Sequence, residues 1–281
     1  MIDPLLRELR RELGAVGIRG RLRRRILAES EDHLLSDPEA PARFGAAQDV
    51  ANAFAAELGA RRSRRAAVSA FAALAVAGAV YAVAFVGASF AGTPDPDMYP
   101  ILAVLAFAAI VFAPQVAFVA GVLAVIRALR RREPVLPSAE LRVINRRTGL
   151  AVGSGLVTMG ALALFAFELR SELAGWWVTF TFVGTATASG LLVLAAVPGV
   201  GATLLRPQVA GEAGDVFDDL GFGRTGPWRF ALGIASGVAL AVWVAGIVQG
   251  DPLDGAVRGL MEAAACLGGF AVFGRFLGLR R

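Results

Sequence analysis

Lysine is absent from this chain, and cysteine and histidine occur once each, as Cys266 and His33. Without lysine a P-loop ATPase is excluded, because its phosphate-binding loop places a lysine on the nucleotide phosphates. A single cysteine excludes an intramolecular disulfide and a cysteine-based zinc site. A single histidine excludes a histidine cluster and argues against a Ser-His-Asp triad. We therefore expect a protein that is not an enzyme and that holds no metal and no cofactor.

The basic residues are unevenly placed along the chain. All 28 are arginine, and 13 of them fall within the first 65 residues. Long apolar stretches of Ala, Val, Leu, Phe and Gly follow, and the whole chain is 56% hydrophobic, above the ~45–50% of an average soluble domain. We therefore expect a basic head, residues 1–62, followed by a membrane body, residues 63–281.

Six apolar stretches in the body reach the ~20 residues that a helix needs to cross a ~30 Å hydrocarbon core. They cover approximately residues 66–90, 100–126, 149–169, 176–204, 229–249 and 255–277. Helix is the expected form because backbone groups in lipid must pair within their own segment. The predicted fold is all-α: a polytopic membrane protein with a six-helix transmembrane bundle and a small N-terminal cytoplasmic helical domain.

Arginine placement predicts the orientation, because cytoplasmic loops carry an excess of basic residues. Of the 28 arginines, only Arg170 and Arg258 lie towards the opposite side, whose short loops carry Asp95 and Glu172. We expect a multi-pass protein of the cell membrane with both termini in the cytoplasm and, because residues 1–60 are charged, no cleavable signal peptide. The arginines then face anionic lipid. Direct binding of nucleic acid is disfavoured, because acidic residues alternate with the arginines of the head.

Apolar residues at helical spacing predict three helices in the head, over about residues 4–13, 19–35 and 47–58. In the first helix, Leu5, Leu9 and Leu13 share one face. Such faces can close a small helical cluster. A core of ~60 residues is marginal by itself, so a partner or the membrane body is expected to steady it.

Three runs in the head carry a family resemblance. They are Leu-Arg-Glu-Leu-Arg-Arg-Glu-Leu at 6–13, Arg-Arg-Ile-Leu-Ala-Glu-Ser-Glu-Asp-His-Leu at 24–34, and the run from Arg43-Phe44-Gly45 to Glu57-Leu58. Over about residues 3–60 the chain resembles the HAAS signalling domain, also called the permease prefix domain, although Ala46 stands where that family commonly has proline. The resemblance implies a cytoplasmic module fused to membrane helices, with a PadR-type transcription regulator as its soluble partner. The candidate partner-binding residues are Leu5, Leu9, Leu13, Ile26, His33, Phe44 and Phe54.

Polar side chains in the predicted spans form a second candidate site. Arg258 and Glu262 lie one turn apart on one face of the last span, and Glu168 ends the third. A charge near mid-bilayer costs on the order of 3 kcal/mol on insertion scales. These three residues are therefore either a polar cluster that binds a cation or small ligand, or interfacial ion pairs whose side chains reach the headgroups. Thr181 and Thr185, one turn apart, are either a polar path or a packing stripe.

Glycine pairs at four-residue spacing also occur in the spans. Such pairs favour close contact between membrane helices, because glycine lets two backbones approach. They are Gly149 with Gly153, Gly233 with Gly237, Gly255 with Gly259, and Gly274 with Gly278.

Together these features predict a membrane-embedded signalling or regulatory protein. The body would detect a ligand or a membrane state, and the head would bind a soluble partner, through a shift between two packings of the bundle. The alternative is a transporter permease or the membrane subunit of an exporter, which requires a polar path. Homo-oligomerisation stays open in both cases.

Overall fold

The computed structural model describes residues 2–36, 44–91, 100–131, 133–211, 213, 227–248 and 252–277. Every regular element within these ranges is an α-helix, as the sequence predicts. The chain divides into two compact units, Met1–Ala213 and Gly214–Arg281, and each is described by itself.

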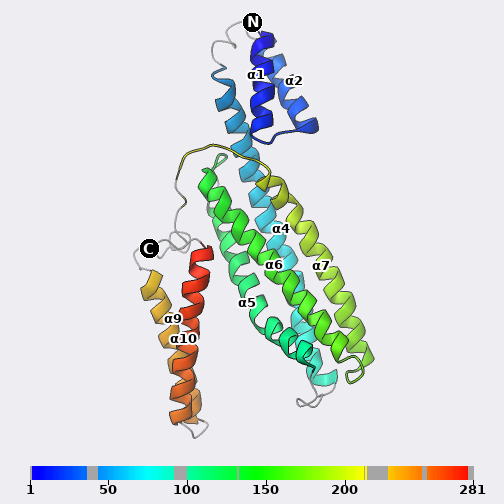
Figure 1. The fold of residues 1–281 in the computed structure, drawn as a ribbon, viewed down its shortest axis with the longest axis vertical. Coiled ribbons are helices and arrows are strands. Elements are labelled where there is room, and N and C mark those ends of the chain that lie inside the picture. The colour runs from blue at the N-terminus through cyan, green and yellow to red at the C-terminus, as the bar shows by residue number, and fades with distance from the viewer. Residues whose placement is uncertain are drawn as a thin grey trace. The chain divides into compact units, whose positions relative to one another are not determined.

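The first unit contains six helices among its described residues (Figure 1). Two short helices come first, and four long ones follow. Their bounds are α1 Ile2–Ala15, α2 Gly20–Ser36, α4 Ala47–Ala91, α5 Ile101–Arg130, α6 Ser138–Glu168 and α7 Gly175–Thr203. We call α4 from residue 63 onward, together with α5, α6 and α7, the four-helix bundle. The second unit contains α9, Pro227–Val248, and α10, Pro252–Leu277.

Helix α4 joins the head to the bundle without a break. Its 45 residues correspond to about 68 Å at 1.5 Å per residue. The prediction placed one helix over 47–58 and a separate one over 66–90. The intervening residues 59–65 contain no proline, and four of the seven are arginine, which favours helix. The first span and the third helix of the head are therefore one rod (Figure 1).

Among the described residues, five helices are long and apolar enough to cross a membrane: α4, α5, α6, α7 and α10. Their bounds agree with five of the predicted spans to within a few residues, apart from the longer starts of α4 and α6. The remaining predicted span, 229–249, falls on α9, whose apolar stretch Ala231–Val244 is shorter. The chain is thus a multi-pass membrane protein by its helices, and a sixth crossing stays a prediction.

The head encloses its own apolar core. Leucine, isoleucine and valine side chains of α1, α2 and the turn between them pack against the alanine-rich first turns of α4, with Leu22, Val50 and Leu58 at the edge. Leu205, which follows α7, completes this core and is only 7% exposed. A distant segment therefore supplies apolar area that the short head lacks.

Small side chains allow the bundle helices to pack closely. Much of the buried surface of α4 is alanine, and one core combines Ala70, Ala73 and Ala77 with Leu192 of α7. A Cβ atom added at Gly184 would lie 2.8 Å from Val80 of α4. Lipid is as apolar as the helices, so close van der Waals contact of this kind stabilises the bundle.

The four predicted glycine pairs differ in their surroundings. Cβ atoms added at Gly255 and Gly259 would come within 2.7 Å of Gly246 and within 2.6 Å of the Ala239 carbonyl, so this pair forms a close contact between α10 and α9. At Gly149 with Gly153 and at Gly233 with Gly237 an added Cβ meets nothing within 4 Å among the described residues, so close contact at these two pairs stays a prediction. Gly278 lies outside the described residues. Spacing alone does not say which face of a helix has a neighbour.

The far end of the bundle, at the C-terminus of α4, is closed by Trp177. Its side chain is 1% exposed, and its Nε1–H donates to the Ala84 carbonyl at 2.8 Å. The Ala174 amide donates to the Ala91 carbonyl at 2.9 Å. These two hydrogen bonds attach the start of α7 to the end of α4.

Candidate functional site at the junction of head and bundle

Most of the predicted partner-binding residues contribute to the core of the head. Leu9 and Leu13 are fully buried and Ile26 is 4% exposed, while Phe44 and Phe54 pack against the same core. Leu5 is half-buried and His33 is exposed. A partner-binding role for these residues stays a prediction, and an exposed partner surface has to be sought elsewhere on the head.

In the last predicted span, Arg258 forms an ion pair within its own helix. Arg258 Nε lies 2.6 Å from Asp254 Oδ2, one turn before it, and both side chains are largely exposed. Glu262 is exposed as well, and Glu168, in the other unit, is half-buried. The predicted cluster combines residues of two units and stays a prediction.

Thr181 and Thr185 are both buried within the bundle, at 0% and 3% exposure. The Thr185 hydroxyl donates to the Thr181 carbonyl at 2.7 Å, so it is satisfied within its own helix, as the packing interpretation requires. Thr181 Oγ1 is buried without a hydrogen-bond partner among the described residues.

A segment that sequence analysis missed connects α7 to the head. We call residues 204–211 the strap. Beyond the buried Leu205, the Arg206 amide donates to the Val16 carbonyl at 3.0 Å, and the Gln208 amide donates to Asn52 Oδ1 at 3.3 Å. The strap therefore contacts two parts of the head, the turn that follows α1 and the first turns of α4.

Gly17 makes this approach possible. It ends α1 with φ +88°, and the Ile18 amide donates to the Leu13 carbonyl at 2.8 Å while the Gly17 amide donates to Gly14. This is a Schellman motif, which requires the left-handed region at its glycine. A Cβ atom here would lie 2.2 Å from the Leu204 carbonyl oxygen. Glycine therefore provides both the turn and the space for the strap.

The other end of the strap contacts the start of α6. The backbone amide of Ser138 donates to the Val209 carbonyl at 3.2 Å, and the Ser138 hydroxyl donates to the same oxygen at 3.2 Å. An added Cβ at Gly211 would lie 2.7 Å from Pro137. One short segment thus contacts the head and the α5–α6 connection together.

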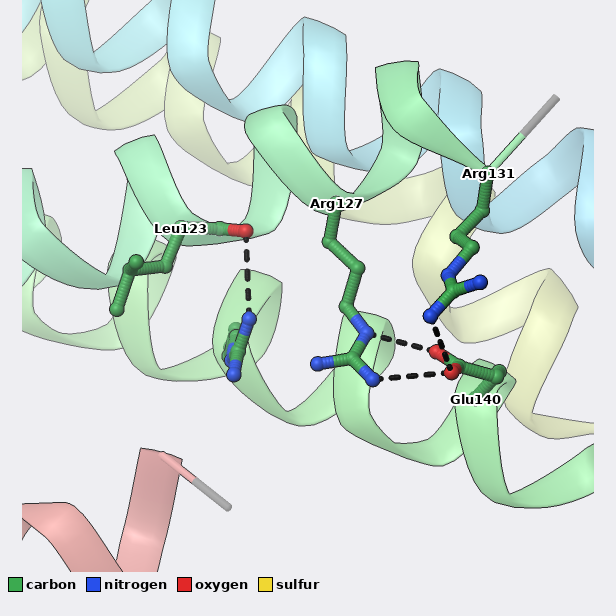
Figure 2. Close-up of polar contacts among 5 residues, drawn as sticks. Leu123, Arg127, Arg131 and Glu140 are labelled. Atoms are coloured by element: carbon green, nitrogen blue, oxygen red, sulfur yellow. Dashed lines mark hydrogen bonds and ion pairs between the residues drawn. The ribbon is translucent and has the colours of Figure 1, made fainter. Parts of the chain in front are cut away.

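A buried ion pair joins α5 and α6 at this same end of the bundle. Arg127 Nε and Nη2 donate to the two carboxylate oxygens of Glu140 at 2.7 and 3.0 Å. The side chains are only 0% and 4% exposed, and Arg131 Nη2 lies 3.8 Å from the same carboxylate. Figure 2 shows both guanidinium groups turned towards Glu140. A bidentate geometry of this kind compensates charges that have lost their water.

Further arginines of the junction donate to main-chain carbonyls. Arg62 Nη1 donates to the Gly201 carbonyl near the end of α7 at 2.9 Å, and Arg64 donates to the Glu133 carbonyl in the α5–α6 connection. Arg147, 1% exposed, donates to the Leu123 carbonyl at 3.4 Å. Gly201 is one of the last carbonyls of α7, which lack intrahelical donors and carry partial negative charge, so the guanidinium group of Arg62 suits it.

The junction is therefore a polar layer that holds three connections: the strap, α4 and the α5–α6 loop. The arginine and glutamate contacts described above are ion pairs and hydrogen bonds within the chain, whereas Ser63 Oγ, Arg64 Nε and Asn145 Oδ1 are buried without a hydrogen-bond partner among the described residues. Within the described ranges, no three His, Cys, Asp or Glu residues are grouped so that they could hold a metal ion.

Comparison with known proteins does not identify a function, so a functional proposal has to be based on the geometry of the chain. No protein-family model, curated protein or solved structure matches the chain. The HAAS resemblance of the head stays a prediction from its residues.

We predict that Glu140→Gln destabilises the full chain by about 3–5 kcal/mol, because it leaves Arg127 charged and buried without its carboxylate. Thermal unfolding of the detergent-solubilised protein, followed by tryptophan fluorescence, measures the loss. The control is Glu57→Gln, which removes the 3.6 Å ion pair between Glu57 and Arg61. The side chains of this pair are 49% and 65% exposed, respectively. Equal melting temperatures for the two variants would contradict a stabilising role of the buried pair.

We predict that Gly17→Ala displaces the strap, since the new methyl group would overlap the Leu204 carbonyl. The control is Gly20→Ala, where φ is +64° and nothing lies within 4 Å of the added Cβ, so it carries only the ~1–2 kcal/mol cost of the left-handed conformation. Hydrogen exchange of the Arg206 amide reports the displacement. Protection lost in Gly17→Ala and kept in Gly20→Ala is expected, whereas equal protection would refute the clash.

Proposed function

We propose that this chain is a membrane-embedded regulatory protein whose head binds a soluble protein in response to a change in the bundle. One observation carries the proposal: the head is attached to the bundle twice, by the continuous helix α4 and by the strap that follows α7. A flexible tether would place the head near the membrane but would not report on the bundle.

The double attachment provides a path for a conformational signal. A small sliding of α7 along α4 moves Leu205 within the head core, because that core is built on α4. Packed cores have few alternative arrangements, so such a shift favours one of two packings rather than a continuous deformation. Any ligand that binds one bundle packing better then changes the population of head states.

A groove between α1 and α2 supports a binding role for the head. It measures about 410 Å³, with Leu6 and Leu27 at its apolar part and Asp3, Arg7, Arg10 and Glu31 around them. Apolar anchors surrounded by both signs of charge fit an amphipathic helix of a partner protein. The HAAS resemblance proposes a PadR-type transcription regulator as that partner.

The arrangement in the membrane completes the proposal. We propose that α9 forms a sixth crossing, that the head is a cytoplasmic N-terminal domain, and that both termini lie in the cytoplasm of the cell membrane. The support is the arginine distribution, because arginines are concentrated at the head end of the first unit and in residues 127–147.

Transport is the less favoured function. It requires a polar path through the bundle. The hydroxyls of Thr158 and Thr185 donate to carbonyls of their own helices, Ser154 and Thr181, and a single buried hydroxyl, that of Thr181, is left without a partner among the described threonines. The ion pairs of the bundle are gathered at the junction instead.

We predict that Arg7→Glu with Arg10→Glu abolishes partner binding by the full chain, because it reverses two charges that line the groove. The control is Arg21→Glu with Arg24→Glu, which reverses two exposed charges at the start of α2. Affinity purification from native membranes with mass spectrometry should recover a DNA-binding regulator with the wild type and the control only. An ATPase recovered equally with all three chains would favour the transport alternative.

The orientation can be measured with single cysteines in a Cys266→Ser background. We predict that a membrane-impermeant maleimide labels Glu172→Cys, in the exposed α6–α7 turn, in intact cells. Glu133→Cys, in the exposed α5–α6 connection, should react only after permeabilisation. The reverse pattern would place the head outside the cytoplasm and overturn the proposed function.

A further inference from the structure

A groove opens between α4 and α5, with α6 at its floor. It has a volume of about 330 Å³, and its lining includes Leu74, Gly78, Pro114, Phe118, Thr158 and Met159. Met159 is 1% exposed, whereas Phe118 at the rim is 63% exposed. The groove thus extends from the bundle core to the outer surface of α4 and α5.

The chemistry of the walls selects an apolar occupant. The lining is mainly alanine, glycine, leucine, methionine, proline and aromatic side chains. The Thr158 hydroxyl is already used, since it donates to the Ser154 carbonyl at 2.9 Å, and the Tyr81 ring stacks on Phe85 at 5.8 Å between centroids. A polar ligand would lose hydrogen bonds to water that these walls replace poorly, since the Tyr81 hydroxyl is the remaining polar side-chain group among the lining residues, and this loss is costly.

The depth of the groove decides where the occupant comes from. Gly78 lies on α4 about 20 Å from Arg65 at 1.5 Å per residue. A ~30 Å hydrocarbon core that begins near the arginines of residues 61–65 therefore includes Gly78. The rim of the groove therefore opens where the solvent is the acyl chains of lipids. A volume near the lower end of the ~300–1,000 Å³ of ligand pockets suits one chain rather than a large molecule.

We propose that this groove binds one acyl chain of a membrane phospholipid, and that this lipid is the ligand to which the bundle responds. The second part of the proposal rests on the proposed function. Three lining residues, Phe71, Leu74 and Gly78, belong to α4, which continues into the head. An occupant that wedges between α4 and α5 favours the bundle packing with the wider separation, and α4 carries that change to the head core.

Gly78 offers a direct way to fill the groove. It lines the groove, and a Cβ atom added to it meets nothing within 4 Å. At Gly155, by contrast, a Cβ atom would lie 2.8 Å from Leu74, so a substitution there would disturb the packing itself. Gly78→Leu is therefore the test variant, with Ala75→Leu at the exposed rim as a second one. Gly190→Leu is the matched control, because Gly190 is an exposed glycine of α7 with equal space around it.

The experiment uses the full chain in phosphatidylcholine vesicles that contain a small fraction of phosphatidylcholine with a diazirine in its acyl chain. After irradiation, mass spectrometry locates the lipid adducts. Adducts on Met159 at the floor and on Ala117 in the α5 wall, both buried, are expected in the wild type and in Gly190→Leu. Gly78→Leu and Ala75→Leu should reduce them roughly tenfold, because the added side chain removes burial worth about two methylene groups.

The proposal would be overturned if the wild-type protein formed no adducts at the floor. That result would mean that another part of the chain, a second copy or nothing occupies the groove. Unchanged adducts in both filled variants would overturn the proposal too. Free palmitate that removes the adducts, where added unlabelled phosphatidylcholine does not, would assign the groove to free fatty acid instead. The lipid adducts are measured in the absence of a soluble partner, so this test does not depend on partner binding. If adducts form but the affinity purification recovers no partner with the wild type or any variant, the proposed function is overturned and the lipid site is not.

Discussion

Arginine guanidinium groups that bind carbonyl and carboxylate oxygens hold this protein together where its helices end. In lipid, a helix satisfies its own backbone, but its terminal carbonyls need outside donors. Arg62 satisfies the end of α7 and Arg127 joins α5 to Glu140 of α6. The absence of lysine fits this arrangement, because the planar guanidinium can bind two oxygens at once, as Arg127 does, whereas an ammonium group acts as a point charge. The strap and the head core are positioned by elements that meet at this layer.

The sequence predicts the spans well and the junction poorly, for a physical reason. Crossing a hydrocarbon core imposes a length and an apolar composition on each helix, and both are local properties. Five predicted spans accordingly match helices that meet these requirements. The contact of Leu205 with the head, or of Arg127 with Glu140, depends on how distant segments pack, and neither follows a sequence period. The one local signal was Gly17-Ile18 after α1, which marks a helix end but does not show what rests on it.

Because sequence periods do not reveal which segments pack together, they also did not distinguish core residues from partner-binding residues. Apolar spacing correctly placed Leu9, Leu13 and Ile26 on inward faces of helices, and it could not separate a core face from a partner face, since both are apolar. The groove between α1 and α2 depends on exposed charges of Asp3, Arg7 and Glu31, which carry no periodic signal. For Thr181 and Thr185, both side chains are buried, and the Thr185 hydroxyl is bonded within α7 while Thr181 Oγ1 has no partner among the described residues, so the choice between packing stripe and polar path stays a prediction.

The place of Leu205 in the head core also sets an order of events during synthesis. The first 58 residues leave the ribosome well before α5, α6 and α7 exist, yet their core is complete only when residue 205 has been made. At ~5–20 residues per second, roughly 7–30 s separate these two moments. The head therefore reaches its final packing only after the four helices of the bundle have been produced and α7 has ended beside it. A nascent chain whose membrane insertion failed would carry an unfinished head, open to chaperones and proteases.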